Sequence, residues 1–316
     1  YRESSSMIQT CDHVLPHGIT LRCRTAGAPG QPVLLFLHGF PEGAFIWDAL
    51  LTHFSAPENG GFRCVAPDLR GFGGSSSPVE VTAYHARHLV QDIRALIALE
   101  SPRAPLACLV AHDWGGALAW SVASQHPDSM QRLMVLNAPH AGAFLRELRE
   151  QDAQRRASDY MRFLRRADAP TLLAAHDFRR AFGFFARPDG KLPAWLTPAL
   201  QAQYRQHWSH GMQGACHYYG ASPLFPPAPG EPDHLAALQL PESMLRVDVP
   251  TLVLWGMSDP ALRPGLLDGL EDWVPRLQIQ QLRNTSHWVV HERPARVIDE
   301  LEHFLQQQFG DDRLAA

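Results

Sequence analysis

An aspartate stands where the sequence pattern predicts a nucleophile. Asp113 follows the apolar run Leu106–Val110 and precedes a helix-like run, and its neighbours Ala111 and Gly115 are small. A polar residue between small residues at a strand-to-helix turn is typical of a nucleophile elbow. We predict that the helix begins at Gly115, and its N-terminus would favour an ionised carboxylate. The alternative interpretation is that Asp113 only caps the helix.

Two further residues could complete a catalytic triad with Asp113. The predicted strand Thr251–Trp255 leads to Asp259, and the predicted strand Leu277–Leu282 leads to His287. The chain order of nucleophile, acid and histidine is that of an α/β-hydrolase. An acid placed before the histidine can hold the imidazole tautomer and stabilise its charged form. By itself, each of the two would be an ordinary loop or turn residue.

A glycine- and proline-containing turn follows the apolar run Val33–Leu37 and provides a second part of the candidate site. The segment is His38-Gly39-Phe40-Pro41-Glu42. We predict that the backbone N–H groups of Phe40 and Trp114 form an oxyanion hole. The segment also makes a tight turn, whatever its chemistry. The glycine-rich loop 71–74 lacks the P-loop lysine and the full dinucleotide pattern, so we interpret it as structural.

The composition indicates a globular protein. The chain has 316 residues, of which 45% are hydrophobic and 19% charged, with a net charge of −4. Without a basic block, nucleic acid is not an expected partner, and no apolar run is long enough to span a bilayer. The five scattered cysteines favour a reduced compartment, the cytoplasm. The sequence begins at Tyr1, so it leaves open whether a targeting segment has been removed.

Alternating strand and helix patterns predict a mostly parallel sheet flanked by helices, the α/β-hydrolase class. The expected hairpin is Ile8–Val14 with Ile19–Arg24, and the expected parallel strands include Phe62–Ala66 and Leu133–Leu136. The strand pattern stops after about residue 140 and resumes near residue 246. We therefore predict a core domain of residues 1–140 and 246–316, with a mostly helical cap of residues 141–245 inserted into it.

These motifs resemble the soluble epoxide hydrolases, which are α/β-hydrolases with an aspartate nucleophile. The resemblance covers nearly the whole chain and is weaker in the cap. The matching segments are His38–Glu42, Asp68–Ser75, His112–Gly116 and the strand ends at Asp259 and His287. Haloalkane dehalogenases usually carry Asn where Phe40 stands, and fluoroacetate dehalogenases carry Arg where Trp114 stands.

The resemblance also implies that two cap tyrosines grip the epoxide oxygen. The segments Ser158–Phe163 and Cys216–Gly220 match in order and spacing, which selects Tyr160 and Tyr219. Gly220 replaces the usual Arg, and His217 replaces the usual Asn. Tyr218 therefore stays open as the second tyrosine.

The chemistry expected of an aspartate nucleophile is displacement at a saturated carbon, because the product is then an ordinary alkyl ester. An epoxide also needs an acid for its leaving oxygen, which tyrosine hydroxyls supply. His287 would then activate water to hydrolyse the ester and release a vicinal diol. A haloacid or haloalkane dehalogenase is the alternative, and a non-catalytic small-molecule receptor on the same fold is a third hypothesis.

The expected ligand is a small apolar molecule, because the cap is rich in aromatic residues. We expect His38, Pro41 and Trp288 to contribute to the substrate-binding surface. The predicted chemistry needs no metal or organic cofactor, and the sequence has no H-E-x-x-H pair. A homodimer is possible.

Overall fold

The computed structural model describes residues 7–228 and 230–309. Its centre is an eight-stranded sheet in the order β1-β2-β4-β3-β5-β6-β7-β8. The strands are β1 (Gln9–Val14), β2 (Thr20–Ala26), β3 (Val33–Leu37), β4 (Arg63–Pro67), β5 (Cys108–His112), β6 (Leu133–Leu136), β7 (Thr251–Gly256) and β8 (Leu277–Leu282). The β1–β2 and β2–β4 pairs are antiparallel, and the other pairs are parallel. The predicted α/β-hydrolase class is confirmed.

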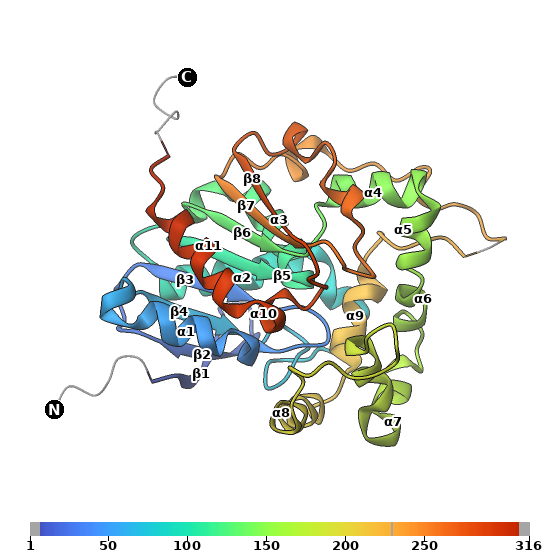
Figure 1. Cartoon of the computed structure of the whole chain (residues 1–316), viewed down its shortest axis with the longest axis horizontal. Helices are drawn as coiled ribbons and strands as arrows, with labels where there is room; N and C mark the ends of the chain where they lie inside the picture. Colours follow the sequence, from blue (N-terminus) through green and yellow to red (C-terminus); the bar gives the residue numbers. More distant parts are fainter. Residues whose placement is uncertain (1–6, 229, 310–316) are drawn as a thin grey trace.

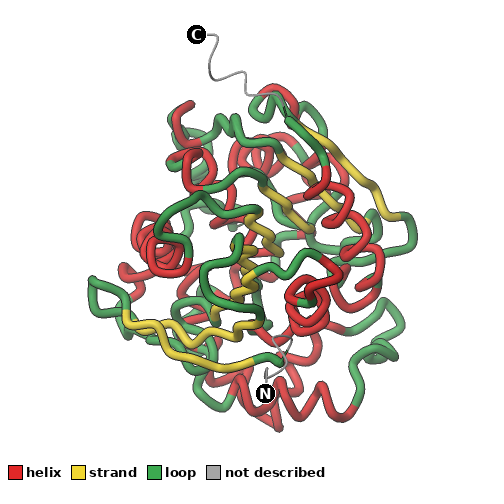
Figure 2. The backbone as a smooth tube through the Cα atoms, turned by 90° about the vertical axis from the view of Figure 1, so that its left-hand side faces the viewer, coloured by secondary structure: helices red, strands yellow, loops and turns green. Residues whose placement is uncertain are grey.

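Helices cover both faces of this sheet (Figures 1 and 2). Helix α1 (Asp48–Ser55) packs with α11 (Pro294–Gln306), and α2 (Ala86–Glu100) packs with α3 (Asp113–Gln125). Helix α11 buries Val297, Leu301 and Phe304. The spacing of these three residues places them on one helical stripe, which is the buried face of the helix. A short helix, α10 (Val289–Glu292), precedes α11.

A helical insertion joins β6 to β7 and covers the right-hand and lower side of the sheet in Figure 1. Its helices are α4 (Ala141–Glu150), α5 (Asp152–Ala157), α6 (Tyr160–Leu164), α7 (Ala169–Phe182), α8 (Pro198–Trp208) and α9 (Gln213–Ala221). We keep the name cap for residues 141–245. None of the helices in the described ranges is long and apolar enough to cross a membrane.

The carboxyl ends of the parallel strands lie at one edge of the sheet, and ligands bind at this edge in open α/β sheets. β3 and β5 are fully buried, as is β7, so the residues that follow them are held by a rigid, packed core. Helix α3 begins at Asp113, two residues earlier than predicted. The nucleophile candidate is therefore the first residue of the helix itself.

Candidate active site

Asp113 occupies a strained turn between β5 and α3. Its φ is +52°, a left-handed conformation that is uncommon for residues other than glycine. A Cβ atom on Gly115 would lie 2.4 Å from the His38 carbonyl oxygen, and one on Gly39 would lie 2.2 Å from Asp113 Oδ1. Glycine is therefore needed at both places for the turn and the neighbouring loop to approach each other.

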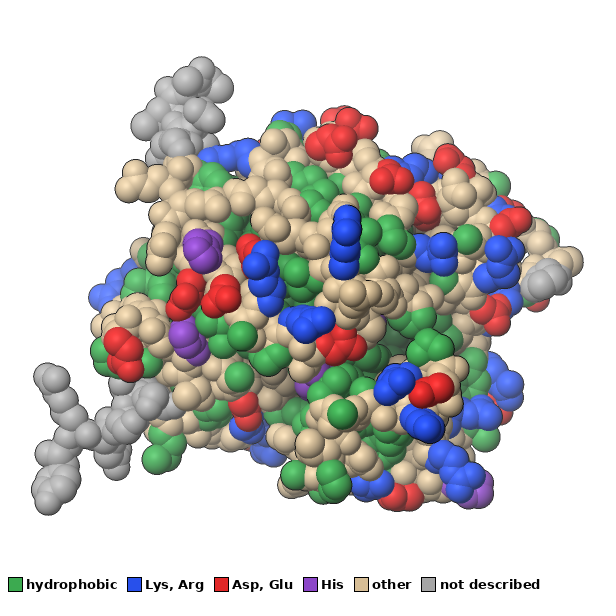
Figure 3. All heavy atoms as spheres, in the orientation of Figure 1, with side chains coloured by type: hydrophobic (Ala, Val, Ile, Leu, Met, Phe, Trp, Pro, Cys, Tyr) green, Lys and Arg blue, Asp and Glu red, His purple; other side chains and the backbone are tan. Residues whose placement is uncertain are grey.

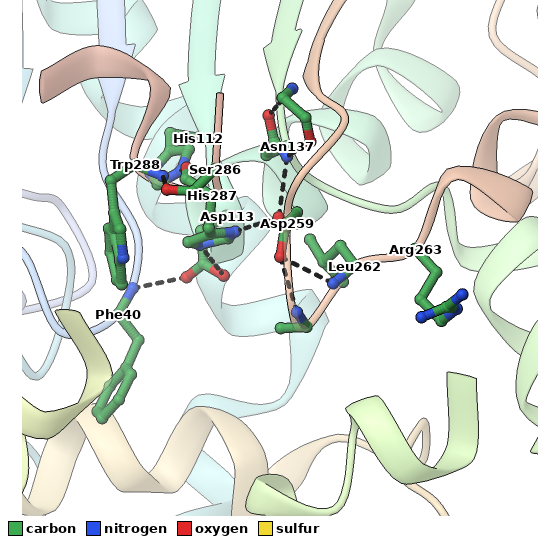
Figure 4. Close-up of polar contacts among 12 residues, drawn as sticks. Phe40, His112, Asp113, Asn137, Asp259, Leu262, Arg263, Ser286, His287 and Trp288 are labelled. Carbon is green, nitrogen blue, oxygen red and sulfur yellow. Dashed lines mark hydrogen bonds and ion pairs between the residues drawn. The ribbon is translucent and has the colours of Figure 1, made fainter. Parts of the chain in front are cut away.

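The Asp113 carboxylate points away from the helix that it begins. The residue at the N-cap of α3 is His112, and its side chain makes no capping hydrogen bond. Asp113 Oδ1 instead accepts a hydrogen bond of 2.6 Å from the backbone N–H of Phe40 (Figure 4). This geometry disfavours the interpretation of Asp113 as a simple helix cap. It also places one of the two predicted oxyanion-hole donors at the carboxylate.

His287 lies between the two aspartates of the predicted triad (Figure 4). Its Nε2 is 3.5 Å from Asp113 Oδ2, and its Nδ1 is 2.6 Å from Asp259 Oδ2. The structure thus brings together three residues that are separated by up to 174 positions in the sequence. Each stands at or just after the carboxyl end of a parallel strand, so the sheet sets their mutual distances.

Both carboxylate oxygens of Asp259 accept hydrogen bonds from neighbouring groups. Its Oδ1 accepts the backbone N–H groups of Ala261 at 2.8 Å and Leu262 at 2.9 Å, and its Oδ2 accepts the Asn137 amide at 2.8 Å. Asn137 follows β6 with a φ of +36° and also bonds both backbone groups of Gly256. Sequence reasoning missed Asn137. The sequence signal that could have indicated Asn137 is its position directly after a buried strand.

The charges of this group are coupled. Burial alone would raise the pKa of Asp113, but the hydrogen bond and positive charge of His287 outweigh it and lower that pKa below its usual range. Burial alone would lower the pKa of His287, but Asp259 and Asp113 together raise it well above 6.5. The lowered pKa of Asp113 favours its ionised form, which a carboxylate nucleophile requires, and the raised pKa of His287 favours a proton on the imidazole beside it.

The two neighbouring tyrosines of α9 face different surroundings. The Tyr218 hydroxyl donates a 2.8 Å hydrogen bond to the Arg70 carbonyl, so it is used within the core–cap contact. The Tyr219 ring lies edge-on to Phe40 at 5.3 Å and to Trp114 at 5.2 Å between ring centroids. The Tyr218 ring also contacts the Trp114 ring, at 5.6 Å. Of this pair, however, only Tyr219 has ring contacts with Phe40 and Tyr160, so Tyr219 faces the Asp113 site.

Tyr160, the first residue of α6, joins the same aromatic cluster. Its ring is 6.0 Å from those of Tyr219 and Phe184. Burial and the nearby Asp113 carboxylate raise the pKa of Tyr160, and burial also raises the pKa of Tyr219. Both phenols therefore keep their protons at neutral pH, as a hydrogen-bond donor to a leaving oxygen must.

The three residues expected on the substrate-binding surface have other contacts. His38 is fully buried, its Nε2 accepts the Leu69 N–H at 3.0 Å, and its Nδ1 lies 2.9 Å from the Gly39 carbonyl. His38 thus holds its own loop, and its place on the substrate-binding surface stays a prediction. The Pro41 carbonyl accepts the indole N–H of cap residue Trp208. The third expected residue, Trp288, stands edge-on to His287 at 4.8 Å and forms a wall beside it.

A buried carboxylate, Glu42, connects the loops behind the triad. Its Oε1 accepts the Tyr204 hydroxyl of α8 at 2.7 Å and lies 2.6 Å from His291 Nε2 of α10. Its Oε2 is 3.3 Å from His112 Nδ1, and His112 Nε2 lies 2.9 Å from the His287 carbonyl oxygen. Glu42 thus connects its own loop after β3 with the turn at Asp113, the loop of His287 and the cap. Sequence reasoning quoted Glu42 and His112 inside motifs but gave them no role.

Tyr204, His291 and His112 surround Glu42, an arrangement that could suggest a metal site. The described residues, however, contain no set of three His, Cys, Asp or Glu side chains that could hold a metal ion. The contacts instead keep the acid ionised. Burial by itself raises the pKa of Glu42, and the charge and hydrogen bond of His291, with His112 close by, bring it below the usual range.

We expect Glu42→Ala to lower the free energy of unfolding by about 3–5 kcal/mol, because it leaves buried partners without their acceptor. The measurement is urea unfolding at neutral pH. Glu302→Ala is the matched control, since Glu302 pairs with His53 at the surface and exposed pairs contribute about 0–1 kcal/mol. Equal losses in the two variants would contradict the structural role of Glu42.

Arg165 connects the two helices that carry the cap tyrosines. It ends α6, the helix that begins at Tyr160, and its guanidinium donates to the carbonyls of Tyr219 and Ser222 at the end of α9. The same guanidinium stacks on the Phe225 ring at 3.6 Å. The last carbonyls of a helix lack intrahelical partners, so a cation there both caps the helix and fixes its direction.

We expect Arg165→Met to lower the rate of substrate turnover by about ten- to a hundredfold, because small displacements of positioned groups cost this much. Arg165→Lys should restore part of the rate. The neighbouring variant Arg166→Met is the control, because Arg166 forms its ion pair with the exposed Asp168 and makes no hydrogen bond to either tyrosine. The measurement is kcat and KM on one substrate; an effect on KM alone would contradict a role in positioning the phenols.

Comparison with known proteins agrees with this geometry. Residues 32–294 match the family described as the alpha/beta hydrolase fold, so the chain belongs to that family. Within it, the chain closely resembles epoxide hydrolases, which confirms the resemblance predicted from the motifs. It is 32% identical over 294 residues to epoxide hydrolase 3 of Xenopus tropicalis, covering 92% of this chain and 76% of the relative.

Solved structures give the same result. The crystal structure of the Bacillus megaterium epoxide hydrolase in complex with an inhibitor matches with a TM-score of 0.82 and 29% identity, over 95% of this chain and all of that chain. A structure of an epoxide hydrolase from metagenomes of hot environments matches with a TM-score of 0.81 and 34% identity, over 96% of this chain and 100% of that chain.

Proposed function

We propose that this protein is an epoxide hydrolase that opens an apolar epoxide to a vicinal diol. One observation carries the proposal: Asp113 lies between the His287–Asp259 pair and a cap cluster that contains Tyr160 and Tyr219. A carboxylate nucleophile needs the histidine to release its ester, and an epoxide needs the phenols to protonate its oxygen.

In the first step, the Asp113 carboxylate attacks an epoxide carbon, and the C–O bond of the ring breaks. The electron pair of that bond moves to the oxygen, which takes a proton from Tyr160 or Tyr219 and becomes a hydroxyl. The product is a hydroxyalkyl ester of Asp113. Its formation removes the negative charge of Asp113, one of the two charges that raise the pKa of His287. His287 can then give its proton to the phenolate or to water.

In the second step, neutral His287, oriented by Asp259, takes a proton from a water molecule as that water attacks the ester carbonyl. The Phe40 N–H already bonds this carboxylate at 2.6 Å, and we propose that it and the Trp114 N–H stabilise the oxyanion. The bond between the carbonyl carbon and the ester oxygen then breaks, and the leaving oxygen takes the second proton of the attacking water. The diol leaves, Asp113 is restored as a carboxylate, and His287 keeps the first proton. The balance is one epoxide and one water converted to one diol.

Dehalogenation is the second candidate, because the same carboxylate can displace a halide and the Trp114 indole lies beside the site. A halide needs no proton, so this reaction leaves the two cap phenols without a role. The third hypothesis, a receptor without turnover, gives the His287–Asp259 pair no role.

The test is a panel of aryl, alkyl and disubstituted epoxides together with haloalkanes and haloacids, incubated with the wild type and with Asp113→Asn. We expect diol from at least one epoxide class with the wild type and a loss of at least about 10³-fold with the variant. Halide release without diol formation would establish the dehalogenase, and ligand binding without any turnover would establish the receptor.

A further inference from the structure

A glutamine of the cap is buried against the loop that carries the triad acid. The outer surface of the cap carries many acidic and basic side chains (Figure 3), and that of Asp152 in α5 is 79% exposed. Gln154 lies two residues further along α5 and is fully buried. A buried amide is tolerated only when its donors and its acceptor have partners, and those of Gln154 all do.

The partners of the Gln154 amide come from two elements that are far apart in the sequence. Its Nε2 donates to the Ala261 carbonyl at 2.7 Å and to Ser158 Oγ at 3.0 Å. Its Oε1 accepts the Arg263 N–H at 3.0 Å. A backbone carbonyl can only accept and a backbone N–H can only donate, so these partners fix the orientation of the amide.

On the core side, Gln154 holds the turn that carries Asp259. Ala261 and Leu262 donate their backbone N–H groups to Asp259 Oδ1, at 2.8 and 2.9 Å. The Ala261 carbonyl that Gln154 binds belongs to the same planar peptide group as the Leu262 N–H. The next N–H along the chain, that of Arg263, also bonds Gln154. Gln154 therefore fixes the peptide groups that hold the triad acid.

On the cap side, Gln154 holds the start of the helix that carries Tyr160. The hydroxyl of the buried Ser158 accepts the bond from Gln154, and the Ser158 carbonyl accepts the Met161 N–H at 3.0 Å. This second bond spans Tyr160, the first residue of α6. The place of Ser158 therefore sets the direction in which α6, and with it the phenol, continues from α5.

We propose that Gln154 is a positioning residue that holds the phenol of Tyr160 in place relative to the Asp259–His287 pair. This inference rests on the proposed function. The cap supplies the acid for ring opening, the core supplies the base for hydrolysis, and both act on atoms bound at Asp113. Because one amide binds the supports of both groups, the acid and the base keep a fixed separation through the two steps.

The test measures the two chemical steps separately. Ester formation on Asp113 is followed in the His287→Gln background, and ester hydrolysis is followed in single turnovers with His287 present. We expect Gln154→Met, which keeps the length of the side chain without the amide, to slow each step by about tenfold. Gln151→Met is the matched control, because Gln151 is exposed and its side chain makes no capping hydrogen bond to α5. It should leave both rates unchanged.

A double-mutant cycle separates positioning from a general effect on the fold. If Gln154 acts on ring opening through the phenol, Gln154→Met in the Tyr160→Phe background should change ester formation by less than about twofold. Ser158→Ala removes the bond on the cap side alone. It should slow ester formation by about threefold and leave hydrolysis at the wild-type rate.

A third variant, Gln154→Glu, tests the donated hydrogen bond itself. Its carboxylate keeps an acceptor for the Arg263 N–H but turns a second oxygen toward the Ala261 carbonyl, which repels it. Protonation restores a donor at that place, and burial favours the protonated acid. In the His287→Gln background, we expect the rate of ester formation relative to the parent enzyme to rise as the pH falls from about 8 to about 6.

The outcomes separate the two proposals. Unchanged rates of both steps in folded Gln154→Met protein would overturn the positioning role and leave the epoxide hydrolase proposal intact. A slowing of ester formation that persists in full in the Tyr160→Phe background would also overturn it. If Gln154→Met does not fold, wild-type ester formation in both Ser158→Ala and Gln154→Glu would overturn it instead. No diol from any epoxide with the wild type would overturn the proposed function itself.

Discussion

Replacement of His287 by glutamine will stop the cycle after ring opening and leave an ester on Asp113. Glutamine can occupy the place of the imidazole but cannot take a proton from water, so alkylation proceeds and hydrolysis slows by about 10²- to 10⁴-fold. Intact-protein mass spectrometry after mixing with excess epoxide should show an adduct equal to the mass of one substrate. Peptide mapping should place that adduct on Asp113.

The double variant Asp113→Asn/His287→Gln is the control, since it keeps the amide in place of the imidazole but removes the nucleophile. It should show no adduct. In the wild type, single-turnover hydrolysis should speed up as the pH rises through the pKa of His287 in the alkyl-enzyme, while ring opening stays level around neutral pH. An adduct mapped to another residue would contradict the proposed nucleophile.

Loss of the cap phenols will slow ring opening in the first step. We expect Tyr160→Phe and Tyr219→Phe each to lower the alkylation rate by about 10²-fold, because each removes one donor to the developing alkoxide. The double variant should be nearly inactive on epoxides. The measurement is single-turnover adduct formation in the His287→Gln background, where hydrolysis does not interfere.

Tyr218→Phe is the matched control for this pair. Its hydroxyl bonds the Arg70 carbonyl, so its removal should affect stability more than ring opening. A larger loss of alkylation in Tyr218→Phe than in Tyr219→Phe would show that the neighbouring tyrosine is the acid. An unchanged alkylation rate in Tyr160→Phe would show that this residue of α6 takes no part in ring opening.

The parts of the site predicted from sequence are those fixed by the order of buried strands. Asp113, Asp259 and His287 each stand at or after a strand end, and the topology of a parallel sheet brings such ends to one edge. The helical insertion was visible as a loss of strand pattern. The start of α3 was misplaced by two residues, since helix ends follow local backbone geometry that the sequence specifies weakly.

The remaining contacts depend on distant pairings that no local pattern encodes. Glu42 meets Tyr204 across 162 positions, and Asn137 meets Asp259 across 122. His38 was placed on the substrate surface because of its motif, whereas its burial could be known only from the packing of its loop against Leu69. The choice between Tyr218 and Tyr219 likewise needed the helix orientation.

The hydrogen bond from Tyr204 to Glu42 limits how freely this scaffold could exchange parts during evolution or engineering. A transplanted lid lacking a tyrosine at that place would leave an ionised acid in the interior with one donor fewer, beside the very turn that holds the nucleophile. Recombination at the boundaries of the insertion must therefore also preserve this one phenol, so that the acid beside the Asp113 turn keeps its donor.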